Sequence, residues 1–120
     1  MGVPANNVQE LTLETSASMA ADFGSFPQEV KYFDMGSVQM TWTGADAATG
    51  TFTPQASVDG VNWCDLASGT AIKKTTVGNG CCMYTFGSIE YAWFRIYFKA
   101  NSNTAGTVVI STFMKRRRNG

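Results

Sequence analysis

The amino-acid sequence predicts an all-β protein, a single β-sandwich of about eight short antiparallel strands with a jelly-roll or immunoglobulin-like topology. The strongest observation is the alternation within residues 91–99, where Phe94, Ile96 and Phe98 share one face. A period of two residues is typical of a half-buried strand and not of a helix. A second observation is the pair Asp59-Gly60, which favours a tight hairpin turn because glycine accepts a positive φ. A third is that frequent turn signals separate the alternating runs, with no long helical pattern between them.

The first 35 residues predict two strands and a less regular segment. Residues 8–15 alternate, with Leu11 and Leu13 on one face. Residues 18–23 favour one helical turn, which the glycine and proline that follow would end. Residues 29–35 predict a short strand.

The next part of the chain carries clearer strand patterns. Gly36 is expected to interrupt the chain before a strand over 37–43, whose inward residues are Val38, Met40 and Trp42. After a polar loop, residues 50–58 alternate, with Phe52, Ala56 and Val58 expected to face the core. A tight turn at Asp59-Gly60 then leads to a second strand that opens on Trp63. Because Pro54 has no backbone N–H, its strand is expected to be an edge strand or to bulge there.

The C-terminal half predicts a marginal strand over 71–77, whose two lysines would protect a sheet edge. A turn is expected over 77–80, followed by strands over 81–86, 91–99 and 107–114. The segments 42–52 and 98–108 resemble each other as hairpins, since both end their loops in Gly-Thr. Convergent turn chemistry and an internal duplication both explain this likeness.

Composition indicates one domain over residues 1–120, with an N-terminal arm over 1–7 and a basic tail over 115–120. A chain of 120 residues is long enough to bury a core without disulfides. The formal net charge is zero, but four of the nine cations lie in the tail, which leaves five cations against nine acids in the body, a net of −4. No signal peptide and no apolar run of about 20 residues is visible, so we expect no membrane partner.

The residue types give no support for catalysis. The sequence has no histidine, so a Ser-His or Cys-His dyad is not available. Its three cysteines form no CxxC motif, and Cys64, Cys81 and Cys82 are expected to be reduced and buried, although a pairing of Cys64 with one of the others is geometrically open. Asp59 and Asp65 could form a carboxylate pair for acid–base catalysis, but both lie where a turn or loop is expected, and aspartate is common at such positions. We therefore expect no enzyme, no cofactor and no metal site.

Two groups of residues could contact a partner. Trp63, Trp93 and Tyr97 could stack on a pyranose ring if they are exposed, or they could be core or interface residues. The tail run Lys115 to Arg118 could neutralise phosphates, but an acidic protein surface suits it as well, and we do not expect a nucleic-acid partner.

The order of turns and aromatic residues resembles that of small β-sandwich virion proteins of tailed bacteriophages. The likeness covers about residues 37–114 and rests on five runs: Val38-Gln39-Met40-Thr41-Trp42-Thr43-Gly44, Gly50-Thr51-Phe52, Ala56-Ser57-Val58-Asp59-Gly60-Val61-Asn62-Trp63, Tyr91-Ala92-Trp93-Phe94-Arg95-Ile96 and Gly106-Thr107-Val108. The Ser57 to Trp63 part of the third run also recurs in discoidin-like domains, but those are usually longer and close with a terminal disulfide, and this chain has no terminal cysteines.

The resemblance implies a non-enzymatic structural protein of the virion, assembled in the host cytoplasm. On this basis we expect a capsid decoration or cement protein that binds the major capsid protein or other virion proteins and forms a homo-oligomer. Its anchors would be Lys115, Arg116, Arg117 and Arg118 in the tail and Val3, Pro4 and Val8 in the arm. Two alternatives stay open: a carbohydrate-binding attachment module that uses Trp63, Trp93 or Tyr97, and a tail accessory protein.

Overall fold

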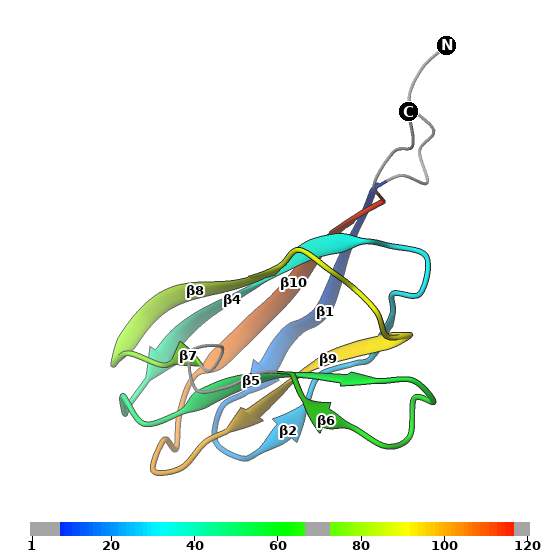
Figure 1. Cartoon of the computed structure of the whole chain (residues 1–120). Helices are drawn as coiled ribbons and strands as arrows, with labels where there is room; N and C mark the ends of the chain where they lie inside the picture. The colour runs from blue at the N-terminus through cyan, green and yellow to red at the C-terminus, as the bar shows by residue number, and fades with distance from the viewer. Residues whose placement is uncertain (1–7, 67–72, 117–120) are drawn as a thin grey trace.

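The computed structural model describes residues 8–66 and 73–116. In these residues the chain forms two antiparallel β-sheets that pack face to face, and it contains no helix (Figure 1). The predicted β-sandwich is therefore confirmed.

The first sheet, sheet A, contains four long strands in the order β1-β10-β4-β8. Their bounds are Val8–Ser18 for β1, Thr107–Lys115 for β10, Met35–Ala45 for β4 and Gly78–Phe86 for β8. Two register shifts, between Thr12 and Glu14 and between Glu14 and Ala17, interrupt the pairing of β1 with β10.

The second sheet, sheet B, is built on two central strands, β5 (Thr51–Ser57) and β9 (Trp93–Lys99). Four two-residue strands flank them: β2 (Phe23–Gly24) and β3 (Gln28–Glu29) along β9, and β6 (Cys64–Asp65) and β7 (Lys73–Lys74) along β5. Ser25 joins β2 to β3, because its amide donates to the Ile96 carbonyl at 2.8 Å and its hydroxyl accepts from the Ile96 amide at 2.9 Å.

The strand order is that of a jelly roll. If β2 with β3 and β6 with β7 are each counted as one interrupted strand, the ten described strands occupy eight positions. One sheet then holds the first, eighth, third and sixth positions, and the other holds the second, seventh, fourth and fifth. Of the two topologies expected from the sequence, the jelly roll is the one observed.

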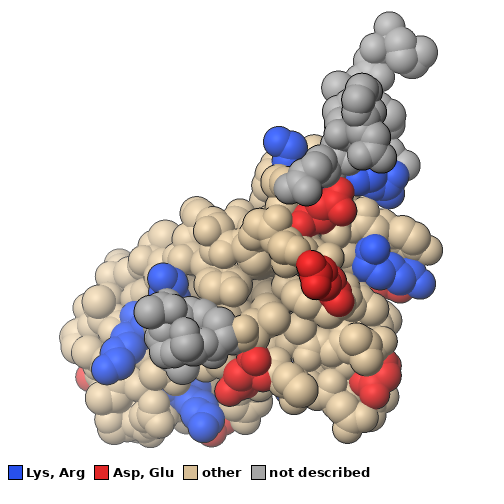
Figure 2. All heavy atoms as spheres, in the orientation of Figure 1, with Lys and Arg blue, Asp and Glu red and all other residues tan. Residues whose placement is uncertain are grey.

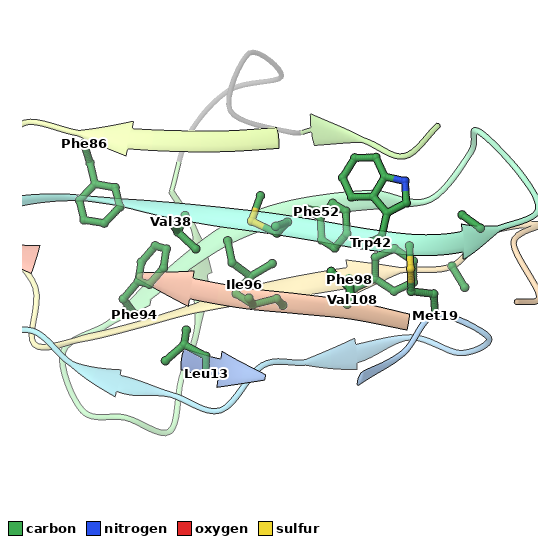
Figure 3. Packing of buried hydrophobic residues seen from close by; sticks show 14 of the residues in the cluster. Leu13, Met19, Val38, Trp42, Phe52, Phe86, Phe94, Ile96, Phe98 and Val108 are labelled. Carbon is green, nitrogen blue, oxygen red and sulfur yellow. The ribbon is translucent and has the colours of Figure 1, made fainter. Parts of the chain in front are cut away.

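The core lies between the two sheets (Figure 3). Sheet A contributes Val38, Met40, Trp42, Val108 and Ile110, and sheet B contributes Phe52, Phe94, Ile96 and Phe98, all 2% exposed or less. The Phe52 ring joins the two layers, with its centroid 5.7 Å from that of Trp42 and 4.9 Å from that of Phe98. The inward residues predicted for 37–43 and 91–99 are thus confirmed.

Several predictions for the N-terminal part were wrong. Residues 18–23 form no helical turn, because β1 continues to Ser18 and β2 begins at Phe23. The expected strand over 29–35 is limited to Glu29 at its start and Met35 at its end, with a turn between them. Gly36 lies inside β4 and does not end a strand. Leu11 is 39% exposed and does not share the buried position of Leu13.

The segment around Asp59-Gly60 also differs from the prediction. A connection over 58–63 joins β5 to β6, so the turn is wider than a two-residue hairpin, and Trp63 precedes the second strand. Val58 has left the strand and is 78% exposed. Pro54 lies in a central strand, not at an edge: its carbonyl accepts from the Leu66 amide at 2.8 Å, and its missing N–H faces the gap between β6 and β7.

Three further expectations are corrected by the C-terminal half. Within 71–77 the described strand is β7 alone (residues 71–72 lie outside the described residues), and the turn expected over 77–80 is largely the start of β8. The two Gly-Thr loops are not hairpins, because β4 to β5 and β9 to β10 both cross from one sheet to the other. The cysteines are free, as predicted, but Cys64 and Cys81 are exposed. Cys82 is half-buried, and burial raises the pKa of its thiol to about 11.

Candidate functional site

The two ends of the described chain lie side by side. β1 begins at Val8, whose register partner in β10 is Lys115. Arg116 follows β10, and its Nε atom donates to the Tyr32 carbonyl at 3.1 Å. The first and last described residues therefore lie at one end of the sandwich (Figure 1). We call it the terminal end; it also carries the connections 30–34, 58–63 and 87–92.

Large apolar side chains are exposed at the terminal end and along the adjoining half of β1, and we include both in this end. Phe26 is 70% exposed and Tyr32 is 62% exposed. With Val8, Leu11 and neighbouring residues they line a surface hollow of about 650 Å³, to which Arg116 also contributes. Apolar side chains that gather in this way favour contact with a partner.

The terminal end brings together part of the predicted anchor. Val8, Lys115 and Arg116 lie within it. Charged side chains are sparse over the face displayed in Figure 2, and they lie both at this end and towards the opposite end. Val3, Pro4, Arg117 and Arg118 lie outside the described residues.

Sequence reasoning missed Phe26 and Tyr32. Phe26 precedes a proline in a segment without strand periodicity, and Tyr32 falls in a turn that was predicted to be a strand. The sequence shows only that these segments contain aromatic residues without strand periodicity. Without a period, the sequence does not indicate whether an aromatic side chain faces the core or the solvent.

A second cluster lies on the outer face of sheet B. Trp93, Arg95 and Tyr97 alternate with the buried residues of β9, and all three are half-buried. The carbon of the Arg95 guanidinium lies 4.5 Å from the centroid of the Trp63 ring and 5.7 Å from that of Tyr97. These distances are those of cation–π contacts. We call Trp63, Arg95 and Tyr97 the Arg95 platform.

Polar neighbours hold the Arg95 platform in place. Arg95 Nε donates to Gln55 Oε1 at 2.8 Å, and Gln55 Nε2 donates to Asp65 Oδ1 at 2.9 Å. A Cβ atom at Gly24 would lie 2.8 Å from the nearest guanidinium nitrogen of Arg95, so glycine leaves room for the arginine there. Two rings and a guanidinium beside amide and carboxylate groups offer both stacking and hydrogen bonding to a ligand.

The three predicted stacking residues therefore separate into two roles. Trp63 and Tyr97 flank Arg95, whereas Trp93 packs beside the turn, with its Nε1 3.2 Å from the position that a Cβ of Gly60 would take. Arg95 was predicted as an outward strand residue and not as part of a site. Its position between the two rings depends on the packing of β9 against β5 and β6, which the local sequence does not show.

Asp59 organises the 58–63 connection. Its Oδ1 accepts from the Ser57 hydroxyl and from the amides of Val61 and Asn62, each at 2.8 Å, and its Oδ2 accepts from Asn62 Nδ2 at 2.9 Å. These donors, the Asn62 amide first, hold the pKa of the Asp59 carboxyl well below its usual range. Gly60 adopts a φ of +77° within this turn. The turn explanation given for Asp59 from the sequence accounts for these contacts.

The opposite end, which we call the loop end, is closed by hydrogen bonds among its connections. Asn103 is 1% exposed. Its Oδ1 accepts from the amides of Asp46 and Ala47, each at 3.0 Å, and its Nδ2 donates to the carbonyls of Met19 and Ala105 at 2.8 and 2.7 Å. The Thr104 hydroxyl and amide donate to Asp46 and lower the pKa of its carboxyl. The connections of this end are 19–22, 46–50, 75–77 and 100–106.

Within residues 8–66 and 73–116, no group of three or more His, Cys, Asp or Glu side chains is placed to hold a metal ion. In the same part of the chain, no helix has the length and apolar character needed to cross a membrane.

Comparison with protein-family models gave no match, and a search of the curated proteins found no relative of this chain.

Proposed function

We propose that this chain is a non-enzymatic structural protein of a tailed bacteriophage virion, a capsid decoration or cement protein that binds the head shell through its terminal end. One observation carries the proposal. At the terminal end, Val8, Lys115 and Arg116 lie beside the exposed Phe26 and Tyr32.

The chemistry of this end suits a protein partner. The hollow supplies apolar area, which forms the centre of a protein interface, while two cations at its margin add attraction to an acidic surface. The jelly-roll architecture occurs in viral capsid proteins and in lectins, so it supports the proposal by analogy of fold alone.

The proposal is tested by occupancy on particles. The variant K115A/R116A removes two cations from the terminal end, and K74A/K99A removes two exposed cations that both lie opposite Thr51 in sheet B. We expect the first variant to bind purified heads roughly fivefold more weakly than the wild type, because rim charges of this kind contribute about 1 kcal/mol in total. We expect the second to bind like the wild type. Equal occupancy of K115A/R116A and the wild type would contradict the proposed anchor.

A carbohydrate-binding attachment module is the second candidate, and the Arg95 platform favours it. A surface pocket of about 340 Å³ beside Tyr97 is lined by Thr53, Gln55 and Asp65, whose polar groups could bind sugar hydroxyls. A glycan array with the wild type, Trp63→Ala and the control Val61→Ala tests this function. Binding that Trp63→Ala abolishes and Val61→Ala retains would support it, and a wild type that binds no glycan would exclude it for the glycans on the array.

A tail accessory protein differs from a decoration protein in its location on the particle. Imaging of particles labelled on this chain distinguishes the two, because label on the head supports decoration and label on the tail excludes it.

A further inference from the structure

Sheet A has two edge strands, β1 and β8, and they differ in how they are protected. In the described residues, β8 pairs with β4 on one side and with no strand on the other. It runs for nine residues, Gly78–Phe86, without a bulge after Gly80, and contains no proline and no charged residue. Long, regular and neutral edge strands present unpaired backbone groups that readily pair with another strand.

β1, the opposite edge, has several of the features that normally prevent such pairing. Two register shifts break its regularity, and it contains Glu10 and Glu14. Residues 26–28, at and before the start of β3, also lie against it: the Phe26 amide donates to Glu14 Oε2 at 2.9 Å, and Gln28 Nε2 donates to Gln9 Oε1 at 2.9 Å. The described edges of sheet B are two-residue strands, which are too short to serve as templates.

The composition of β8 suits pairing with a second copy of itself. In an antiparallel pair across a two-fold axis, each residue lies opposite a residue of the same strand, so a charged residue near the axis would approach its own copy. The outward residues of β8 are Asn79, Cys81, Met83 and Thr85, which are neutral and exposed. No register of self-pairing therefore brings like charges together.

We propose that two copies of this chain associate through β8, antiparallel across a two-fold axis, to form one continuous eight-stranded sheet from two copies of sheet A. A sheet of this size lies within the usual range for open sheets. The proposed pairing uses the backbone edge of β8 and does not depend on the function proposed for the terminal end.

The test compares two pairs of lysines on the same outer face of sheet A. M83K/T85K places them on the edge strand, at exposed outward positions. The control T107K/V109K places them on β10, at exposed outward positions two strands away, roughly 10 Å from β8. Circular dichroism first confirms that each variant keeps the wild-type strand content. Sedimentation velocity over a dilution series then gives the mass of each protein.

We expect the wild type and T107K/V109K to have about twice the 13.0 kDa mass of the chain at high concentration, and M83K/T85K to be monomeric throughout. Hydrogen exchange should also be slower in the β8 amides of concentrated wild type than in those of M83K/T85K. A monomeric wild type, a trimer, or an M83K/T85K variant that associates like the wild type would overturn the proposal. Loss of association in T107K/V109K alone would assign the contact to the face of the sheet and overturn it as well.

Discussion

The two ends of the sandwich differ in how far their side chains are buried and hydrogen-bonded within the chain. At the loop end, the Asn103 side chain makes four hydrogen bonds that join three connections. At the terminal end, Phe26 and Tyr32 are exposed, and the hydroxyl of Tyr91 is buried without a hydrogen-bond partner among the described residues. Groups that are satisfied within the chain contribute to stability, a buried unpaired hydroxyl lowers it, and exposed apolar groups are available to a partner.

This contrast leads us to expect that stability and attachment depend on different ends. Substitutions at the loop end should lower the free energy of unfolding and leave binding by folded molecules intact. Substitutions of the exposed residues at the terminal end should weaken binding to the particle and leave the free energy of unfolding nearly unchanged.

The largest stability loss is expected for Asn103→Ala. It removes four hydrogen bonds and leaves backbone groups of residues 19, 46, 47 and 105 without their partner. We expect the free energy of unfolding to fall by about 3 kcal/mol in urea denaturation. Ser102→Ala removes one exposed hydrogen bond, between the Ser102 and Thr49 hydroxyls at 2.7 Å, and should cost at most about 1 kcal/mol. A loss for Asn103→Ala no larger than that of Ser102→Ala would remove the claimed difference between the ends.

A smaller effect of opposite sign is expected for Tyr91→Phe. The change removes a buried hydroxyl that has no partner among the described residues and keeps the ring. The free energy of unfolding should rise by about 1 kcal/mol. Tyr97→Phe, in which the altered ring is half-exposed on the outer face of sheet B, serves as the control and should change it by less than about 0.5 kcal/mol. Destabilisation by Tyr91→Phe would show that the hydroxyl is satisfied after all.

The smallest effect concerns the pH dependence contributed by Asp59. Its pKa is lower in the folded than in the unfolded chain, so its ionised form adds stability above the unfolded value, near pH 4, and this contribution is lost as the pH falls further. The difference in melting temperature between the wild type and Asp59→Asn should therefore be constant from pH 7 to about pH 5 and shrink towards pH 2. A difference that grows on acidification would contradict the sign of the shift.

Strand periodicity was enough to predict β4, β9 and β10 and the inward residues of the first two. It failed for glycines within strands, which were interpreted as breaks. A Cβ at Gly36 would lie 2.5 Å from the Met114 sulfur, and one at Gly80 would lie 2.4 Å from the Trp42 ring. These glycines are needed because a neighbouring strand or side chain passes close by, and that proximity is tertiary information.

The candidate sites, like the strands, were predictable only in part. Val8, Lys115 and Arg116 could be predicted as parts of one candidate anchor because they lie near the ends of the chain. The exposure of Phe26 and Tyr32 does not, because it depends on how the residues before β4 pass over the end of β1. The two-residue strands β2, β3, β6 and β7 were also missed, since pairs of residues are too short to show a period.

The most direct test of the central claim, that the terminal end is the attachment surface, is a hydroxyl-radical footprint of the chain on the particle and free in solution. Phe26, Tyr32 and the loop-end residue Val77 are all more than 60% exposed, so each reacts in the free chain. We predict that Phe26 and Tyr32 become protected on the particle while Val77 stays reactive. Protection of Val77 with continued reactivity of Phe26 and Tyr32 would contradict the account.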